Sequence, residues 1–352
     1  MDYLFEYLLF LAQAVTIVAA ILLVIAAVAS LSMRRQQGDS GHLEIIRLND
    51  RLKDLRDGVR QAVLPPAEFK RILKKDNKAE KKAQKQLAKS SARSGGGSEA
   101  GPEERKRRVF VLDFRGDLQA SRVKLLRTEV TAVLTLAEAP DEVLIRLESP
   151  GGSVHGYGLA ASQLDRFKQH GVPLIASVDK VAASGGYLMA AVADRILAAP
   201  FAVIGSIGVV AQIPNVHRLL KKHDVDVDIL TAGKYKRTLT VLGENTEEGR
   251  QKFVEELEDL HSLFQEFVGS RRPALDIEQV ATGEAWYGKR ALDLKLVDEI
   301  CTSDEYLAKA CMDADVFEVH WVEQKKPIER LLAQAESSLT SLLEQARGVW
   351  HR

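Results

Sequence analysis

The pattern of hydrophobic and polar positions changes several times along the chain. Residues 7–33 form one apolar run without a charged side chain. From residue 107 onward, short apolar runs alternate with amphipathic stretches of helical period. Residues 328–350 again place apolar side chains on one helical face. The pattern predicts an apolar N-terminal helix, an α/β domain and a C-terminal amphipathic helix.

The apolar run is long enough to cross a bilayer, because a helix needs roughly 20 residues for a hydrocarbon layer of about 30 Å. We expect an uncleaved anchor over residues 1–33, since the residues before the apolar run are acidic and the run exceeds the usual length of a signal peptide. A signal peptide cleaved after residues 27–29 is the alternative. Arg34 and Arg35 follow directly, so the positive-inside rule predicts a single pass in a bacterial-type inner membrane, with all later residues in the cytoplasm.

Charge is unevenly distributed, although the chain has 49 basic and 49 acidic residues in total. Residues 34–108 hold 21 basic and 11 acidic residues, whereas residues 109–352 hold 28 and 36. Nucleic-acid binding is the less favoured interpretation of the basic segment, since Phe69 is its only aromatic residue before the α/β domain. A solvated stalk that attracts anionic lipid headgroups fits better.

The stalk is expected to be helical. Its apolar residues follow a 3-4-3-4 spacing typical of a short coiled-coil helix: Ile45, Leu48, Leu52, Leu55 and Val59. Pro65 and Pro66 end this pattern, and a second, lysine-rich helix is predicted over about 67–89, followed by a flexible Gly/Ser-rich linker. The predicted domains are therefore an anchor (1–33), a basic helical stalk with linker (34–106), an α/β domain (107–325) and an amphipathic helix (326–352).

The α/β domain is predicted to have a mostly parallel sheet covered by helices. Strands are expected in the segments RRVFVLDFR, EVLIRLE, VPLIASVD and DRILAAP, with helices between them. Ligands of such sheets bind at the carboxyl ends of the strands. The glycine-rich turns follow the strands at that edge, so the candidate chemistry is expected there.

Two of these turns together suit acyl transfer. Gly151 and Gly152 follow one strand and present backbone N–H groups without a side chain in the way. Ser184 follows another strand among small residues, with Gly185 next to it. A nucleophile beside two N–H donors is the arrangement that acyl transfer requires. Each turn by itself is also an ordinary connection between a strand and a helix.

A serine nucleophile needs a base. The cationic run 233–237 contains Lys234 and Lys236, and a lysine can act as base when desolvation keeps it neutral. Ser206, in the turn GSIGV, could orient such an amine. The histidines His217 and His223 are less suitable, because they belong to a polar helical surface. The sequence has neither a phosphate-binding loop nor a His/Cys cluster, so no nucleotide or metal cofactor is expected.

The motifs SPGGS, AASGGY, GSIGV and GKYKR, in this order, closely resemble those of the S49 serine peptidases, the signal-peptide-peptidase A group. The block GEAWYGKRALDLKLVDEI at 283–300 resembles a later block of the same family. The anchor, the basic N-terminal extension and the single catalytic domain resemble the SohB branch in particular. The resemblance implies a ClpP/crotonase-like superfamily fold and an ATP-independent Ser–Lys endopeptidase that assembles as a homo-oligomer.

The same resemblance implies individual roles. Ser184 would be the nucleophile, Lys236 the general base and Ser206 the residue that positions the lysine. Gly152 and Gly185 would supply the oxyanion N–H groups. Lys234 remains the rival base, since spacing by itself does not separate the two lysines. One implication conflicts with the charge pattern, because this family generally works on the outer face of the membrane.

We therefore expect a membrane-anchored serine endopeptidase that cleaves apolar segments such as signal peptides or membrane-protein fragments. Its partners would be a peptide or protein substrate, membrane lipid through residues 1–33 and other copies of the chain, without nucleic acid. Two alternatives remain. A crotonase-type acyl-CoA enzyme would use the same paired amides, and a catalytically silent membrane scaffold would keep only the fold.

Overall fold

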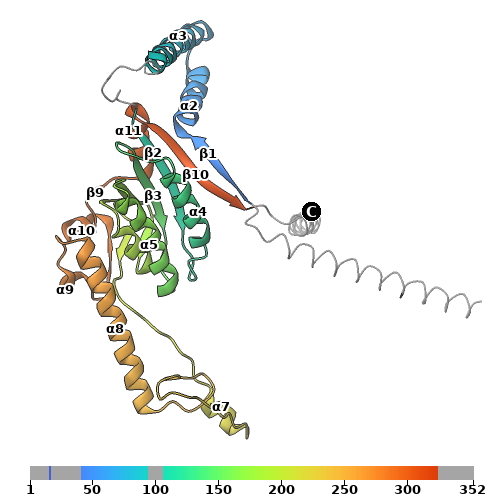
Figure 1. Ribbon diagram of the computed structural model, residues 1–352, viewed down its shortest axis with the longest axis vertical. Coiled ribbons are helices and arrows are strands. Elements are labelled where there is room, and N and C mark those ends of the chain that lie inside the picture. The colour runs from blue at the N-terminus through green and yellow to red at the C-terminus, as the bar shows by residue number, and fades with distance from the viewer. Residues whose placement is uncertain (1–15, 17–40, 94–105, 324–352) are drawn as a thin grey trace, which may run out of the picture. The chain divides into compact units, whose positions relative to one another are not determined.

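The computed structural model describes residue 16 and residues 41–93 and 106–323 (Figure 1). Apart from Thr16, the predicted anchor lies outside the described residues, as do most of the linker and the predicted C-terminal helix. Among the helices of the described part, none is both long and apolar enough for a membrane span. Residues 44–320 form one unit, which contains every candidate site residue, and the described ends 41–43 and 321–323 belong to another.

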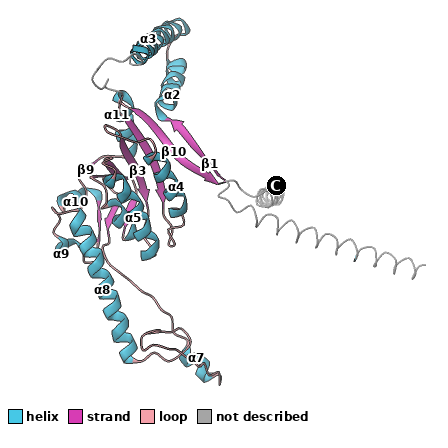
Figure 2. Cartoon of the chain, in the orientation of Figure 1, coloured by secondary structure: helices cyan, strands magenta, loops and turns pink. Residues whose placement is uncertain are grey.

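Strands and helices alternate along most of the described chain (Figure 2). The strands are β1 (Gly41–Arg47), β2 (Arg108–Arg115), β3 (Glu142–Glu148), β4 (Leu174–Val178), β5 (Val181–Ala183), β6 (Arg195–Ala198), β7 (Val203–Gly205), β8 (Ala285–Tyr287), β9 (Glu299–Ile300) and β10 (Asp315–Glu323). The helices are α2 (Leu48–Val63), α3 (Pro66–Arg93), α4 (Val123–Leu134), α5 (Val154–Gln169), α6 (Gly185–Ala190), α7 (His217–Lys222), α8 (Glu247–Arg271), α9 (Ile277–Val280), α10 (Gly288–Asp293) and α11 (Ser303–Asp313).

The main sheet has seven strands in the order β1-β10-β2-β3-β4-β6-β9. All pairings from β10 to β9 are parallel. A smaller sheet has the order β5-β7-β8, in which β5 and β7 are parallel and β7 and β8 antiparallel. The prediction of a mostly parallel sheet with helical crossovers is confirmed, because the buried apolar runs form strands and the amphipathic stretches form helices.

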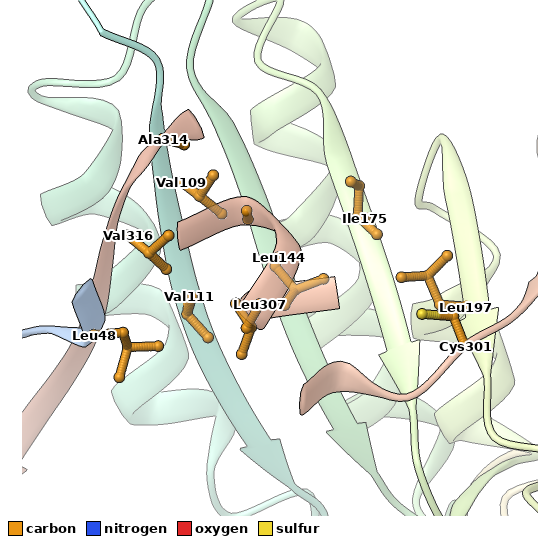
Figure 3. Packing of buried hydrophobic residues seen from close by; sticks show 11 residues of the cluster. Leu48, Val109, Val111, Leu144, Ile175, Leu197, Cys301, Leu307, Ala314 and Val316 are labelled. Atoms are coloured by element: carbon orange, nitrogen blue, oxygen red, sulfur yellow. The ribbon is translucent and has the colours of Figure 1, made fainter. Parts of the chain in front are cut away.

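Both faces of the main sheet are covered. On one face, Leu307 and Ala310 of α11 pack with side chains of β2, β3 and β4 in a cluster that is drawn in Figure 3. On the other face, α4, α5 and α6 pack on the sheet and on one another. There the Phe114 and Tyr157 rings meet edge to face, with centroids 6.2 Å apart. The helices therefore leave the carboxyl ends of the central strands as the place where side chains can meet a ligand.

The stalk differs from the prediction at its start. Ile45 lies in β1 rather than in a coiled-coil helix, and α2 begins only at Leu48. Leu48 is buried in the core cluster, while Leu55 and Val59 stay exposed. The physical reason is tertiary, since the Asn49 side chain bonds the backbone at Cys311, Ala314 and Val316 and ties this junction to the main domain. The expected helix break at Pro65 and Pro66 is confirmed.

Candidate active site

The two glycine turns predicted from the sequence lie next to each other at the carboxyl ends of β3 and β5. The Ser149 amide donates to the Val181 carbonyl at 2.8 Å, and the Ala183 amide donates to the Ser149 carbonyl at 3.0 Å. These bonds join the residue after β3 to β5 on both sides. The candidate oxyanion turn and the candidate nucleophile are thereby held at one edge of the fold.

Ser184 connects β5 to α6 in an unusual backbone conformation. Its φ is 51°, in the left-handed region that residues other than glycine seldom adopt. Its amide donates to the Gly205 carbonyl of β7 at 2.8 Å, which helps to hold that conformation. The side chain makes no capping bond to α6, and the residue is only half-buried. Strain of this kind costs about 1–3 kcal/mol and is concentrated at active sites.

The backbone amides of the two glycine turns differ in whether they already donate a hydrogen bond within the fold. The Gly151 amide donates to Ser149 Oγ at 3.1 Å. Within the described residues, the amides of Gly152 and Gly185 make no backbone or side-chain hydrogen bond. A Cβ at Gly151 would lie 2.7 Å from the Ser184 Cβ and 2.8 Å from the Gly185 nitrogen. The geometry therefore leaves the two expected oxyanion donors available in the immediate surroundings of Ser184.

Ser206 lies beside the nucleophile segment, and its hydroxyl bonds no lysine within the described residues. It follows Gly205, whose carbonyl accepts the Ser184 amide. Its own amide donates to the Glu284 carbonyl at 2.6 Å, and its hydroxyl donates to the Gly283 carbonyl at 3.3 Å. Like Ser184, it has a positive φ of 51°. In this chain Ser206 therefore anchors the turn after β7 to the segment before β8.

The candidate bases lie elsewhere. The segment of Lys236 lies near the start of α8, because the carbonyl of Thr238, two residues further on, lies beside Gly249 of that helix. The strand β7 instead contacts α10, which comes after the end of α8 in the sequence. Figure 1 shows α7 and α10 near opposite ends of α8. The 25 residues of α8 span about 37 Å at the usual helical rise. A single chain does not bring Lys236 to Ser184.

The two lysines differ in their surroundings. Lys234 Nζ lies 2.7 Å from Glu248 Oε1, and this hydrogen bond raises the pKa of the Lys234 amine. Such a lysine is a poor candidate for a neutral base. The exposed Lys236 has no side-chain hydrogen bond or ion pair within the described residues. Of the two, Lys236 is the lysine whose amine remains uncommitted.

Sequence reasoning missed two residues of the site. Ser149 appeared only as part of a motif, and Tyr157 had no assigned role, yet both are fully buried beneath the glycine turn. Their hydroxyl oxygens are 2.5 Å apart. The one signal in the sequence is that Tyr157 lies in the first turns of the helix that follows SPGGS. Their contact with each other depends on the fold.

A possible metal-binding group lies away from these turns. Ligand atoms of Asp113, Glu318 and His320 lie within 4.8 Å of one another. Arg146, however, donates to both carboxylates, including a bond of 2.6 Å to Asp113 Oδ2. Burial lowers the pKa of Arg146, but the bonds to the carboxylates outweigh it, and the pKa is raised. The guanidinium occupies the place of a cation, so the group is an ion-pair cluster.

Replacing this arginine is expected to destabilise the fold. In Arg146→Met the two partly buried carboxylates of Asp113 and Glu318 lose their shared counter-charge, which should lower the free energy of unfolding by about 3 kcal/mol. Urea unfolding of the full chain measures the change. Arg195→Met is the matched control, because its pair with Glu299 is exposed and should contribute less than about 1 kcal/mol. Equal losses in the two variants would contradict the prediction.

Comparison with known proteins identifies the class of protein to which this chain belongs. Residues 2–164 match the profile of the peptidase family S49 N-terminal region, and residues 166–316 match that of peptidase family S49. The chain is 51% identical over 346 residues to a probable protease SohB of Haemophilus influenzae, covering 98% of this chain and 96% of that protein. It is 45% identical over 307 residues to a probable protease SohB of Buchnera aphidicola subsp. Schlechtendalia chinensis, covering 87% and 99% respectively.

A likeness to a solved structure was also found. The structure is a mutant of the 1510-N membrane-bound stomatin-specific protease, with 14% sequence identity and a TM-score of 0.41 over 61% of this chain and 98% of that chain.

The chain is a peptidase, and its own fold combines α/β elements in two sheets. It belongs to peptidase family S49 and is SohB-like, as the motif resemblance predicted. The finer assignment to a ClpP/crotonase-like superfamily stays a prediction, as do the domain boundaries and the roles of individual residues.

Proposed function

We propose that the protein is a membrane-anchored serine endopeptidase that cleaves peptide bonds in apolar segments. The observation that carries this proposal is the geometry at Ser184. The half-buried Ser184 has a strained backbone and stands beside the amides of Gly152 and Gly185, which make no hydrogen bond within the described residues. A serine that merely caps a helix would need neither the strain nor the unused donors.

The proposed reaction follows from these groups. Ser184 Oγ attacks the carbonyl carbon of the scissile peptide while Lys236 Nζ takes the hydroxyl proton. The negative charge that develops on the carbonyl oxygen is stabilised by the N–H groups of Gly152 and Gly185. Lys236 then returns the proton to the leaving amine, which breaks the C–N bond and leaves an acyl-serine. Water, deprotonated by the same amine, attacks the ester carbonyl, the C–Oγ bond breaks, and the amine returns the proton to Ser184 Oγ.

The lysine in this scheme is proposed to come from a second copy of the chain. Lys236 lies far from Ser184 of its own chain, and its segment carries many exposed apolar side chains. Val210 and Leu230 are 91% and 94% exposed, and further exposed members are Leu219, Val225, Ile229, Val241 and Leu242. A partner chain that covered these residues would bury apolar surface and remove water from the amine, which favours its neutral form.

Membrane attachment and substrate choice are proposed from the sequence. Residues 1–33 would anchor the chain in a bacterial-type inner membrane, with the catalytic domain on the cytoplasmic side by the charge rule. A site held near a bilayer would meet membrane-protein fragments and released signal peptides first. The relatives named above are described as probable proteases, which supports peptide substrates over acyl-CoA thioesters.

Covalent labelling tests the proposal. The full chain, purified in detergent, is treated with a fluorophosphonate probe that reacts with activated serines. We expect the wild-type chain to be labelled and Ser184→Ala to be unlabelled, because the probe needs the nucleophile and its oxyanion donors. Ser162→Ala is the control, since Ser162 is an exposed serine of α5 that bonds only its own helix. Equal labelling of Ser184→Ala and wild type would overturn the proposal, and a folded but unlabelled wild type would favour the scaffold or acyl-CoA alternatives.

A further inference from the structure

Two buried hydroxyl groups beneath the glycine turn are not used in the reaction described above. Ser149 and Tyr157 are both completely buried. Ser149 Oγ accepts the Gly151 amide at 3.1 Å and lies 2.5 Å from Tyr157 Oη, which in turn donates to the Asp117 carbonyl at 2.8 Å. One arrangement of the hydroxyl protons satisfies this whole series of hydrogen bonds. The Gly151 amide donates to Ser149, Ser149 donates to Tyr157, and Tyr157 donates to Asp117.

This series of hydrogen bonds determines which amide of the glycine turn can donate to the carbonyl oxygen of the substrate. Because Ser149 binds the Gly151 amide, that amide is unavailable to an oxyanion, whereas the Gly152 amide has no partner in the part of the chain that the structure describes. Gly151 has a φ of 90°, so its conformation is one that few other residues could adopt. Without the Ser149 acceptor, the turn would lose the bond that fixes the direction of its amides.

Tyr157 also contacts the second oxyanion donor. A Cβ placed on Gly185 would overlap the Tyr157 ring, so the ring lies directly against the first residue of α6. Tyr157 Oη and Ser149 Oγ are packed just as closely against Gly116, because a Cβ placed there would overlap both atoms. Tyr157 thus touches the glycine turn through Ser149 and the nucleophile helix through its ring. Tyr157 therefore helps to fix the distance between the two amides, together with the backbone hydrogen bonds that join Ser149 to β5.

We infer that Ser149 and Tyr157 are positioning residues that aim the Gly152 and Gly185 amides at the carbonyl oxygen of the substrate. The inference rests on the proposed function, because it assigns a role within the same serine-peptidase site. Both side chains are completely buried, so we expect neither to touch the substrate. They act by holding two backbone donors in place before the reaction, which is the property that makes oxyanion stabilisation effective.

The test uses kinetics on a fluorogenic peptide with the full chain. In Ser149→Ala, kcat is expected to fall by about 30- to 100-fold, with KM changed by less than about 2-fold, because a misdirected donor weakens the transition state and not substrate binding. Inhibition by a peptide aldehyde, whose serine adduct carries the same oxyanion, should weaken by a similar factor. Ser177→Ala is the matched control. Ser177 is also a buried serine, but its hydroxyl has no partner within the described residues, so kcat should stay at the wild-type value.

Tyrosine variants keep the inference testable if Ser149→Ala folds poorly. Tyr157→Phe retains the ring against Gly185 and leaves Ser149 able to accept from Gly151, so a smaller fall in kcat of about 3- to 10-fold is expected. The double variant Ser149→Ala/Tyr157→Phe should be no slower than Ser149→Ala, because the two hydroxyls act through one chain of bonds.

The outcomes separate this inference from the proposed function. If wild type is labelled at Ser184 but Ser149→Ala keeps the kcat of Ser177→Ala, the positioning role is wrong and the peptidase proposal stands. A raised KM with unchanged kcat would also overturn the positioning role, since it would indicate substrate binding. If wild type neither cleaves peptide nor labels at Ser184, both proposals fall together.

Discussion

A chain carrying Lys236→Ala is expected to cleave peptide at least about 10³-fold more slowly than wild type, while remaining folded. The physical reason is that no histidine, carboxylate or lysine hydrogen-bonds to Ser184 within the described residues, so this part of the chain offers no second base for the proton of its hydroxyl. The variant should keep its thermal stability, because Lys236 is exposed and makes no side-chain bond there. Peptide hydrolysis and thermal unfolding of the full chain measure the two effects.

Lys234→Ala is the matched control for this loss. Lys234 is two residues away and similarly exposed, but its amine is bound to Glu248. Its removal should change kcat by less than about 3-fold. Full activity in Lys236→Ala together with loss in Lys234→Ala would reverse the assignment of the base.

The separation of Lys236 from Ser184 makes the same experiment informative about assembly. If the dyad forms between copies, two inactive chains should restore each other's activity. Ser184→Ala and Lys236→Ala are co-expressed with different tags and purified through both. In a ring assembled at random, each site needs Ser184 from one variant and Lys236 from the other, so about one quarter of the wild-type activity is expected. Complete inactivity of the mixed oligomers would contradict a dyad shared between copies.

The second large effect is expected at Gly151. Gly151→Ala places a Cβ 2.7 Å from the Ala183 carbonyl and the Ser184 Cβ, at a φ of 90°. Backbone atoms of Ala183 and Gly185 leave the methyl group no space, so the turn must shift away from Ser184. We expect kcat to fall by at least about 10²-fold, as for the loss of an oxyanion donor, and stability to fall as well. Steady-state kinetics and urea unfolding measure both.

Gly158→Ala is the control for the added methyl group. Gly158 lies in α5, where a Cβ would meet nothing within 4 Å. Alanine is the better helix former, so this variant should keep full activity and gain about 0.5–1 kcal/mol in the free energy of unfolding. If Gly151→Ala behaves like Gly158→Ala, the close packing of the glycine turn on the nucleophile has no catalytic role.

Much of the fold was predictable because its strands are continuous apolar runs. Residues 174–178 read as a buried strand, and β4 is buried on both faces between helices. The glycines that follow such strands also placed the candidate site at the carboxyl ends of the strands, since a turn of glycines leaves its amides uncovered by side chains. The start of the stalk was not predictable. Ile45 and Leu48 fit a helical period, and only their pairing with a strand and a core distant in sequence makes one a strand residue and the other a core residue.

The candidate site, too, was predictable from the sequence only in part. The sequence by itself determined the residue types that acyl transfer needs, the order of their motifs and the membership of family S49. Only the tertiary structure decided how these residues combine. It showed that the Gly151 amide is bound by Ser149 while those of Gly152 and Gly185 are unused, and that Lys236 lies at the far end of a long helix from Ser184. Local patterns reflect local conformation and burial, whereas these hydrogen bonds and distances join segments far apart in the chain, and only folding brings them together or keeps them apart.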